Sequence, residues 1–200
     1  MRVEFTEEMK GFYTRRAPAY DVGFVTGQRD WNRLMFRLTI GTDDVAAMLE
    51  DPQHRMTARG FVRCRELGAA DLSVERGTFH LFAPGEEPGR LAMRYRLPFE
   101  SSRGPMTLLG FKDVGNDGGP DVWPDTTTLF TRLVEAADAD FDHPEDDTFA
   151  RGILRLDALM LGRQMTTFRG TPLGVARFLA FFAGRVVQVY GRRPRQEATS

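Results

Sequence analysis

Apolar and polar residues alternate with a period of two along much of this chain, and this pattern limits the fold more than any other feature. The alternation is clearest in residues 33–40 and 91–99, where the apolar side chains share one face. Half-buried β-strands produce this pattern, because successive side chains point to opposite sides of a sheet. Weaker alternation predicts further strands at residues 2–13, 56–64, 72–82, 106–114, 126–134, 151–157 and 161–169.

Two segments have a helical pattern instead. Residues 43–50 follow Thr42, a suitable N-cap, and form a short helix that ends before Asp51-Pro52. Residues 173–190 form a long helix, with Pro172 in its first turn and Gly191 at its end. The long helix is apolar over most of its circumference, so we expect it to pack on a sheet face or on another subunit.

A weak internal repeat of about fifty residues relates residues 33–82 to residues 90–134, although chance similarity between amphipathic strands explains it equally well. Residues 56–61 resemble residues 106–111, and each copy carries a glycine inside the strand, Gly60 or Gly110. Such glycines favour a bend or bulge, which lets a sheet curl into a barrel. We therefore expect one mainly β domain over residues 1–200: an antiparallel, lipocalin-like barrel of about 8–9 strands with a C-terminal helix, in preference to a sandwich.

Composition excludes several classes of protein and site. The 200 residues include one cysteine and three histidines, so we expect neither an internal disulfide nor a zinc site. The net charge of −1 gives no bulk attraction to nucleic acid. Residues 1–10 carry three glutamates and no apolar core of a signal peptide, and polar residues interrupt the apolar segment 173–190. We expect a cytoplasmic protein with no membrane span.

The sequence contains no motif that names a reaction. The G-x-S-x-G nucleophile elbow, the phosphate-binding P-loop, the H-E-x-x-H zinc motif and the C-x-x-C motif are all absent from it. Any catalysis is therefore expected to use no cofactor and no metal.

The densest polar cluster runs from Lys112 to the threonines that follow Asp125. It is either a solvated hairpin loop or the polar mouth of the barrel. In the second interpretation Asp125 is a general acid or base or a hydrogen-bond anchor, and Trp123 shields it from water. In the catalytic version Lys112 or an arginine stabilises a developing oxyanion. The residues predicted to line the cavity are Tyr95, Phe111, Trp123, Phe130, His80 and Phe168.

Each of these candidates also has a purely structural explanation. His80 lies between Phe79 and Leu81 and fits a hydrogen-bonded structural residue, and the aromatic residues fit an ordinary core. His54 and His143 lie beside turns that contain proline and are expected to be exposed.

Several blocks of sequence carry a resemblance to a known family. They are residues 5–11, 74–82, 110–114, 121–129, 152–154 and 164–169, and the Trp-Pro-Asp-Thr-Thr-Thr run at 123–128 is the most specific. Together they resemble an accessory region of actinobacterial cholesterol-oxidase-like proteins of the glucose–methanol–choline oxidoreductase group. There the region accompanies a flavin domain and often an α/β-hydrolase domain. This chain shows neither, so the resemblance implies no FAD, no serine chemistry and no catalytic residue. It implies an association with the oxidation or hydrolysis of sterol-like, lipid or polyketide molecules.

Three functions remain open. The first is binding of a hydrophobic small molecule (sterol-like, lipid or polyketide) in the barrel, beside a flavin oxidoreductase or hydrolase of lipid or natural-product metabolism. The second is a cofactor-independent isomerase or cyclase that uses the same cavity. The third is a structural partner that docks through its C-terminal helix, with a homodimer as one form of that docking.

Overall fold

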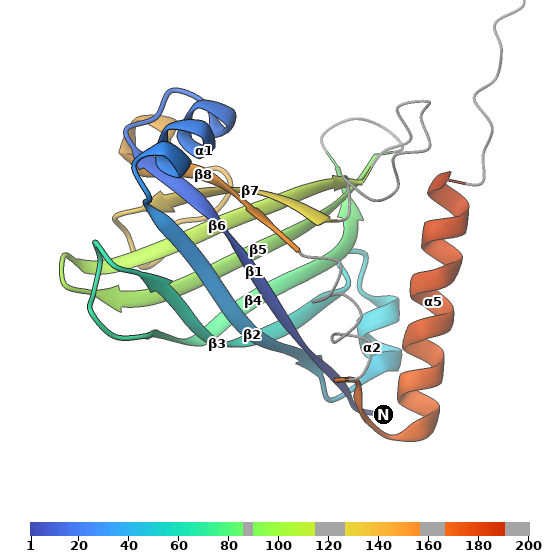
Figure 1. The fold of residues 1–200 in the computed structure, drawn as a ribbon. Coiled ribbons are helices and arrows are strands. Elements are labelled where there is room, and N and C mark those ends of the chain that lie inside the picture. The colour runs from blue at the N-terminus through green and yellow to red at the C-terminus, as the bar shows by residue number, and fades with distance from the viewer. Residues whose placement is uncertain (86–89, 115–126, 157–166, 191–200) are drawn as a thin grey trace, which may run out of the picture.

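The computed structural model describes residues 1–85, 90–114, 127–156 and 167–190 (Figure 1). Within these ranges it contains nine strands: β1 (Val3–Arg15), β2 (Arg33–Thr42), β3 (Arg55–Cys64), β4 (Leu72–Pro84), β5 (Leu91–Ser101), β6 (Gly104–Val114), β7 (Thr128–Val134), β8 (Thr148–Arg155) and β9 (Arg169–Gly170). The helices are α1 (Tyr20–Arg29), α2 (Val45–Glu50), the 3₁₀ turn η1 (Glu145–Asp147) and α5 (Pro172–Tyr190). The predicted mainly β fold with one long C-terminal helix is confirmed.

The strands close into an antiparallel barrel. Strands β2 to β8 are neighbours in chain order, and β1 pairs with both β8 and β2, which completes a barrel of eight strands within the described residues. The two residues of β9 extend the sheet by pairing with Val3 and Glu4. This closure excludes the sandwich and leaves no long free edge among the barrel strands. The predicted internal duplication stays a prediction.

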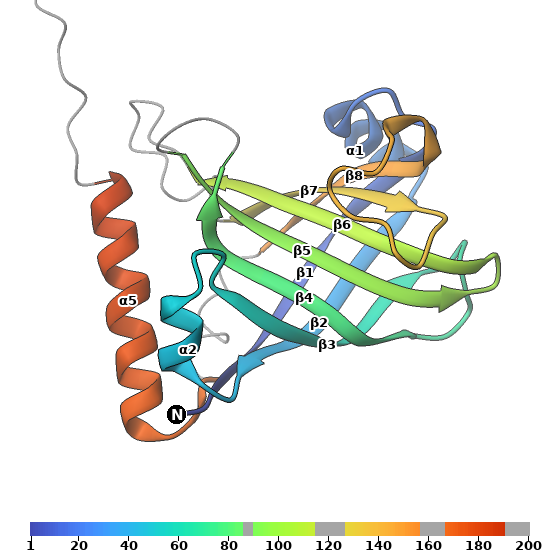
Figure 2. The same ribbon diagram turned by 180° about the vertical axis from the view of Figure 1, so that it is seen from behind.

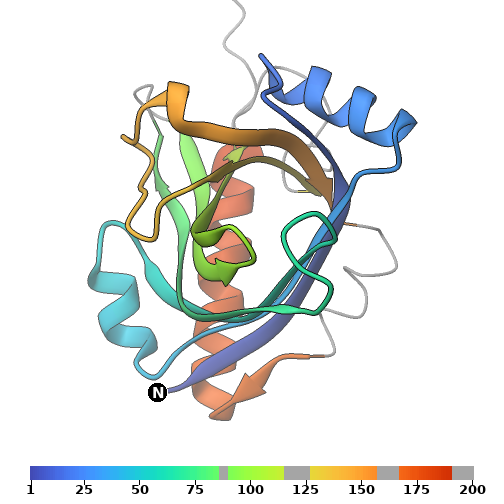
Figure 3. The same ribbon diagram turned by 90° about the vertical axis from the view of Figure 1, so that its left-hand side faces the viewer.

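One large hydrophobic cluster fills the barrel. Its members come from alternate positions of the strands, such as Phe5 and Met9 on β1 and Leu97 and Phe99 on β5. Figure 3 looks along the barrel and shows α5 crossing behind its far end. The period-two pattern is therefore the pattern of one face buried inside a barrel.

Helix α5 covers one end of the barrel beside α2 (Figures 1 and 2). Phe178 is 2% exposed, and its ring centroid lies 5.9 Å from that of Phe5. Phe182 packs against Phe82, with 5.3 Å between ring centroids. Part of the apolar surface of the helix is thus covered by the barrel itself, while Leu173, Leu179 and Val187 remain exposed. The homodimer stays a prediction.

Helix α1 was not predicted from the sequence. It packs on the outer face of β1 and β8, where Phe24 meets Phe12 edge-on. A Cβ atom at Gly23 or Gly27 would lie 2.2 Å from the carbonyl oxygen of Arg151 or Tyr13, respectively. These glycines lower the helix propensity of the segment, but the close contact with the barrel requires them.

The two strand glycines behave differently. Gly60 has a φ of +154° and lies at a register shift between β3 and β4, so the predicted bend is present there. Gly110 keeps regular register with both neighbouring strands, so no bulge is present there. A Cβ at Gly110 would lie 3.1 Å from the Leu129 side chain, which gives this glycine a packing role instead. Of the predicted strand 161–169, residues 161–166 lie outside the described residues.

Candidate functional site

A cluster of three polar side chains lies inside the apolar barrel. The carboxylate of Glu7 accepts a hydrogen bond from the Tyr95 hydroxyl at 2.8 Å through Oε2 and contacts Lys112 Nζ at 3.0 Å through Oε1. The three residues are 3%, 1% and 2% exposed, respectively. We call Glu7, Tyr95 and Lys112 the interior triad.

The strand pattern places these side chains on the interior face. Glu7 has the same parity on β1 as Phe5 and Met9, and Lys112 has the same parity on β6 as Leu108 and Val114. Strand β1 is not a neighbour of β5 or β6 in the sheet. The bonds from Glu7 to Tyr95 and Lys112 therefore connect different sides of the barrel through its interior.

The triad lies in surroundings that disfavour charge. The rings of Phe36 and Phe79 lie 5.7 Å and 4.7 Å from that of Tyr95, and Lys112 Nζ lies 5.4 Å from the same ring. Burial raises the pKa of Tyr95 well above its usual value, and the charge of Glu7 and its hydrogen bond raise it further. The phenol is therefore protonated at neutral pH and serves as a donor.

A buried ion pair needs an explanation other than stability. Desolvation of two charges costs about as much as their attraction returns, and an apolar pair of similar volume is often as stable or more stable. Ionisable side chains that contact one another in a buried place are instead typical of functional sites. The interior triad is therefore the first candidate site.

Two of the predicted site residues, Lys112 and Tyr95, come together in this triad. The third member, Glu7, was missed, because the glutamates near the N-terminus were used only to exclude a signal peptide. The available signal was its position between Phe5 and Met9 on the apolar face of an alternating strand.

Phe111 and Phe130 do not line the interior, which corrects the prediction that they face a barrel cavity. Since neighbouring residues on a strand point in opposite directions, the inward position of Lys112 turns Phe111 outward. The two rings stack on the outer face with 5.3 Å between centroids, and Tyr20 of α1 meets both edge-on.

The remaining candidates lie apart from the triad. His80 is half-buried on the outer face, where Nδ1 lies 3.3 Å from Gln53 Oε1. Phe168 packs against Phe5 and Phe178 under α5. Trp123 and Asp125 lie outside the described residues.

The expected exposure of two histidines is corrected. His54 is 5% exposed because Phe181 of α5 covers its ring at 4.9 Å. His143 is half-buried, and its Nε2 lies 3.4 Å from Asp147 Oδ2.

No helix in the described part of the chain is long and apolar enough to cross a membrane. In the same part, no three histidine, cysteine, aspartate or glutamate residues are grouped so that they could hold a metal ion. Comparisons with protein-family models, with curated proteins and with solved structures each found no match to this chain. The site therefore has to be interpreted from its own geometry.

Proposed function

We propose that this protein binds a hydrophobic small molecule inside the barrel and that the interior triad recognises a polar group of that molecule. The chemical class, sterol-like, lipid or polyketide, rests on the family resemblance described above. The observation that carries the proposal is the buried contact of Glu7 with Tyr95 and Lys112 in an otherwise apolar interior. A bound hydroxyl or carbonyl group would exchange hydrogen bonds with these three side chains.

The composition of the interior supports adaptation to a ligand. Five buried methionines belong to the core cluster: Met9, Met48, Met56, Met93 and Met106. Methionine side chains are unbranched and polarizable, and they repack around partners of different shape at low cost. We expect the ligand to occupy space that these side chains vacate.

Thermal unfolding in the presence of ligands tests the proposal. A panel of progesterone, palmitate and the aromatic polyketide emodin covers the three chemical classes. A molecule that binds only the folded state raises the melting temperature, and the rise grows with the logarithm of the ratio of its concentration to its dissociation constant. At least one class should raise it, and the Tyr95→Phe variant should reduce that shift because it removes one hydrogen-bond donor.

Tyr13→Phe is the matched control. Tyr13 is similarly buried, at 2% exposed, and also donates to a carboxylate, that of Glu66, at 2.9 Å, but this partner is not a member of the triad. This variant should keep the ligand-induced shift of the wild-type protein. An equal loss in both variants, or no shift with any member of the panel, would contradict binding at the triad.

A cofactor-independent isomerase or cyclase is the second candidate function. It is favoured by the contact of a carboxylate, a phenol and an ammonium group, which together offer a proton acceptor, a proton donor and a positive charge. In this version Glu7 takes a proton from the carbon next to a carbonyl and returns it to another carbon, while Lys112 stabilises the oxyanion. The roles predicted for Asp125 and Trp123 stay predictions.

Incubation of a bound carbonyl compound in D₂O separates the two candidates. An enzyme would place deuterium beside the carbonyl, and Glu7→Gln would slow this exchange by about 10²–10⁴-fold. A binding protein would release the compound without deuterium. The cytoplasmic location and the accessory role beside an oxidoreductase or hydrolase remain part of the proposal.

A further inference from the structure

A pocket lies on the outer face of the barrel, on the opposite side of the sheet from Lys112. Its volume is about 320 Å³. Strands β5 and β6 form its floor, and α1, the segment after β7 and η1 contribute its walls. We call it the outer pocket, and its lining includes Tyr20, Arg94, Phe111, Arg132, Phe141 and Glu145.

One wall of the outer pocket is aromatic. Phe111 stacks on Phe130 with an interplanar angle of 28°, and the Tyr20 ring stands at 80° to Phe111. All three side chains are only half-buried. Partly covered rings in this arrangement offer a face and an edge to a further flat ring.

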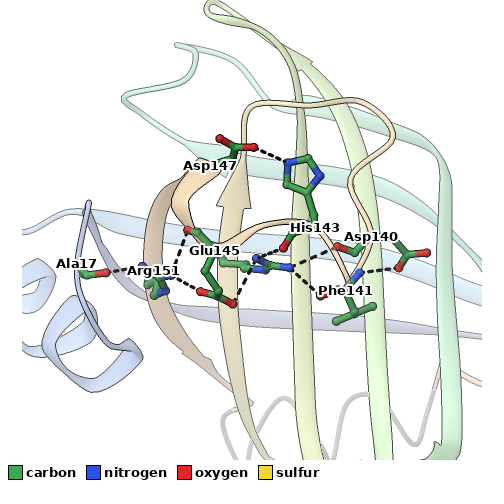
Figure 4. Close-up of polar contacts among 8 residues, drawn as sticks. Ala17, Asp140, Phe141, His143, Glu145, Asp147 and Arg151 are labelled. Atoms are coloured by element: carbon green, nitrogen blue, oxygen red, sulfur yellow. Dashed lines mark hydrogen bonds and ion pairs between the residues drawn. The ribbon is translucent and has the colours of Figure 1, made fainter.

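The opposite wall is held in place by Arg132. This arginine is 4% exposed, and its guanidinium donates to the backbone oxygens of His143 at 3.0 Å and Phe141 at 2.9 Å. Glu145 lies 3.3 Å from Arg132. Glu145 also pairs with Arg151, which donates to the Ala17 oxygen at 2.7 Å (Figure 4). These contacts tie the segment after β7 to the start of α1, so the pocket is formed before any ligand arrives.

Arg94 takes no part in the network of Arg132, Glu145 and Arg151, so its positive charge can meet a ligand. Its guanidinium lies over the Phe141 ring at 5.4 Å. Among the described residues it has no hydrogen-bond or ion-pair partner, whereas Arg90 is paired with Asp113. A guanidinium fork matches the two oxygens of a carboxylate and binds them better than it binds a neutral group.

From this geometry we infer that the outer pocket binds a small planar aromatic carboxylate, with its ring against Phe111 and Tyr20 and its carboxylate on Arg94. The pocket is at the lower end of the volumes that small-molecule sites occupy, which favours a ligand of one or two fused rings. This inference is independent of the proposed function, since no residue of the interior triad lines the outer pocket.

Titration with 2-naphthoate, followed by calorimetry and by NMR, tests the inference. The wild-type protein should bind 2-naphthoate saturably and bind the neutral 2-naphthylmethanol at least tenfold more weakly. Arg94→Gln should weaken 2-naphthoate binding by roughly 10–100-fold, the loss expected for a charge-assisted hydrogen bond. Arg37→Gln, which changes an exposed arginine on the outer face of β2, is the matched control and should bind as the wild type does.

Three results would overturn the inference. One is the absence of saturable binding up to the solubility limit of 2-naphthoate. Another is equal affinity in the wild-type and Arg94→Gln proteins. The third is a change in the Lys112 ammonium signal on addition of 2-naphthoate, which would locate the compound inside the barrel. If progesterone, palmitate and emodin all failed to bind inside the barrel, the three results with 2-naphthoate would be unaffected. The two proposals can therefore fail separately.

Discussion

Lys112 Nζ lies 3.0 Å from Glu7 Oε1 although the two residues are 105 positions apart in the chain, and both are almost completely buried. The contact joins β1 to β6 through the interior of the barrel. Each charge therefore depends on the other, because water does not solvate either of them. This dependence makes the pair accessible to measurement.

A double-mutant cycle on Glu7 and Lys112 measures their coupling. Lys112→Met leaves the Glu7 carboxylate buried without its cation, and Glu7→Leu leaves the Lys112 ammonium without its anion. Each single change should lower the free energy of unfolding in urea by about 3–5 kcal/mol. The double variant should lose much less than the sum, and strictly additive losses would contradict a direct pair.

The burial of His54 predicts that the free energy of unfolding depends on pH. Burial lowers the pKa of His54, and the positive charge of Arg185 lowers it further. The unfolded chain then takes up a proton near pH 6.5, above the pKa in the folded state. The neutral His54 ring therefore contributes fully to the free energy of unfolding above pH 6.5. This contribution is lost as the pH falls towards the pKa of His54 in the folded protein.

The variant His54→Asn removes this titration and suits the backbone, whose φ at this position is +42°. Urea unfolding between pH 7.5 and pH 5 should show a smaller loss of stability in the variant than in the wild type. His80→Asn serves as a comparison, because burial also lowers the pKa of His80. Unchanged pH dependence in His54→Asn would show that the ring is protonated without cost in the folded protein.

The packing of α5 on the barrel depends on Phe178. Replacing this fully buried side chain with alanine should cost about 3–5 kcal/mol of unfolding free energy. Leu179 on the same helix is 39% exposed, and Leu179→Ala should cost far less. Similar losses in the two variants would mean that α5 does not pack on the barrel through Phe178.

Cys64 reports on opening of the barrel. It is fully buried at the end of β3, and burial raises the pKa of its thiol. The thiolate is the reactive form, so iodoacetamide should modify the native protein far more slowly than the urea-unfolded chain. Equal rates, measured by mass spectrometry, would contradict burial of this residue.

The barrel strands were predictable because the alternation of apolar and polar residues that marks each strand is a local sequence pattern. Alternation in residues 33–40 and 91–99 reflects one face against a common core, and β2 and β5 lie there. Helix α1 was not predictable in this way, because Gly23 and Gly27 weaken its helical pattern. These glycines are required by close contacts with strands β8 and β1, which a local pattern does not show.

The candidate site was predictable only in part. The charge of Lys112 and the aromatic ring of Tyr95 make both residues candidates from the sequence, but the sequence does not show which face of a strand turns inward. The same uncertainty placed Phe111 and Phe130 wrongly inside the barrel. The partnership of Lys112 with Glu7 depends on how the sheet closes, and no local pattern contains that information.

The most direct measurement uses the fact that the chain has only two lysines, Lys10 and Lys112. In protein labelled with ¹⁵N-lysine, NMR resolves the exposed Lys10 ammonium from the buried Lys112 ammonium. A panel compound that raises the melting temperature should shift the Lys112 signal to saturation and leave Lys10 unchanged. If such a compound saturates the protein while the Lys112 signal stays in place, the ligand does not bind at the interior triad.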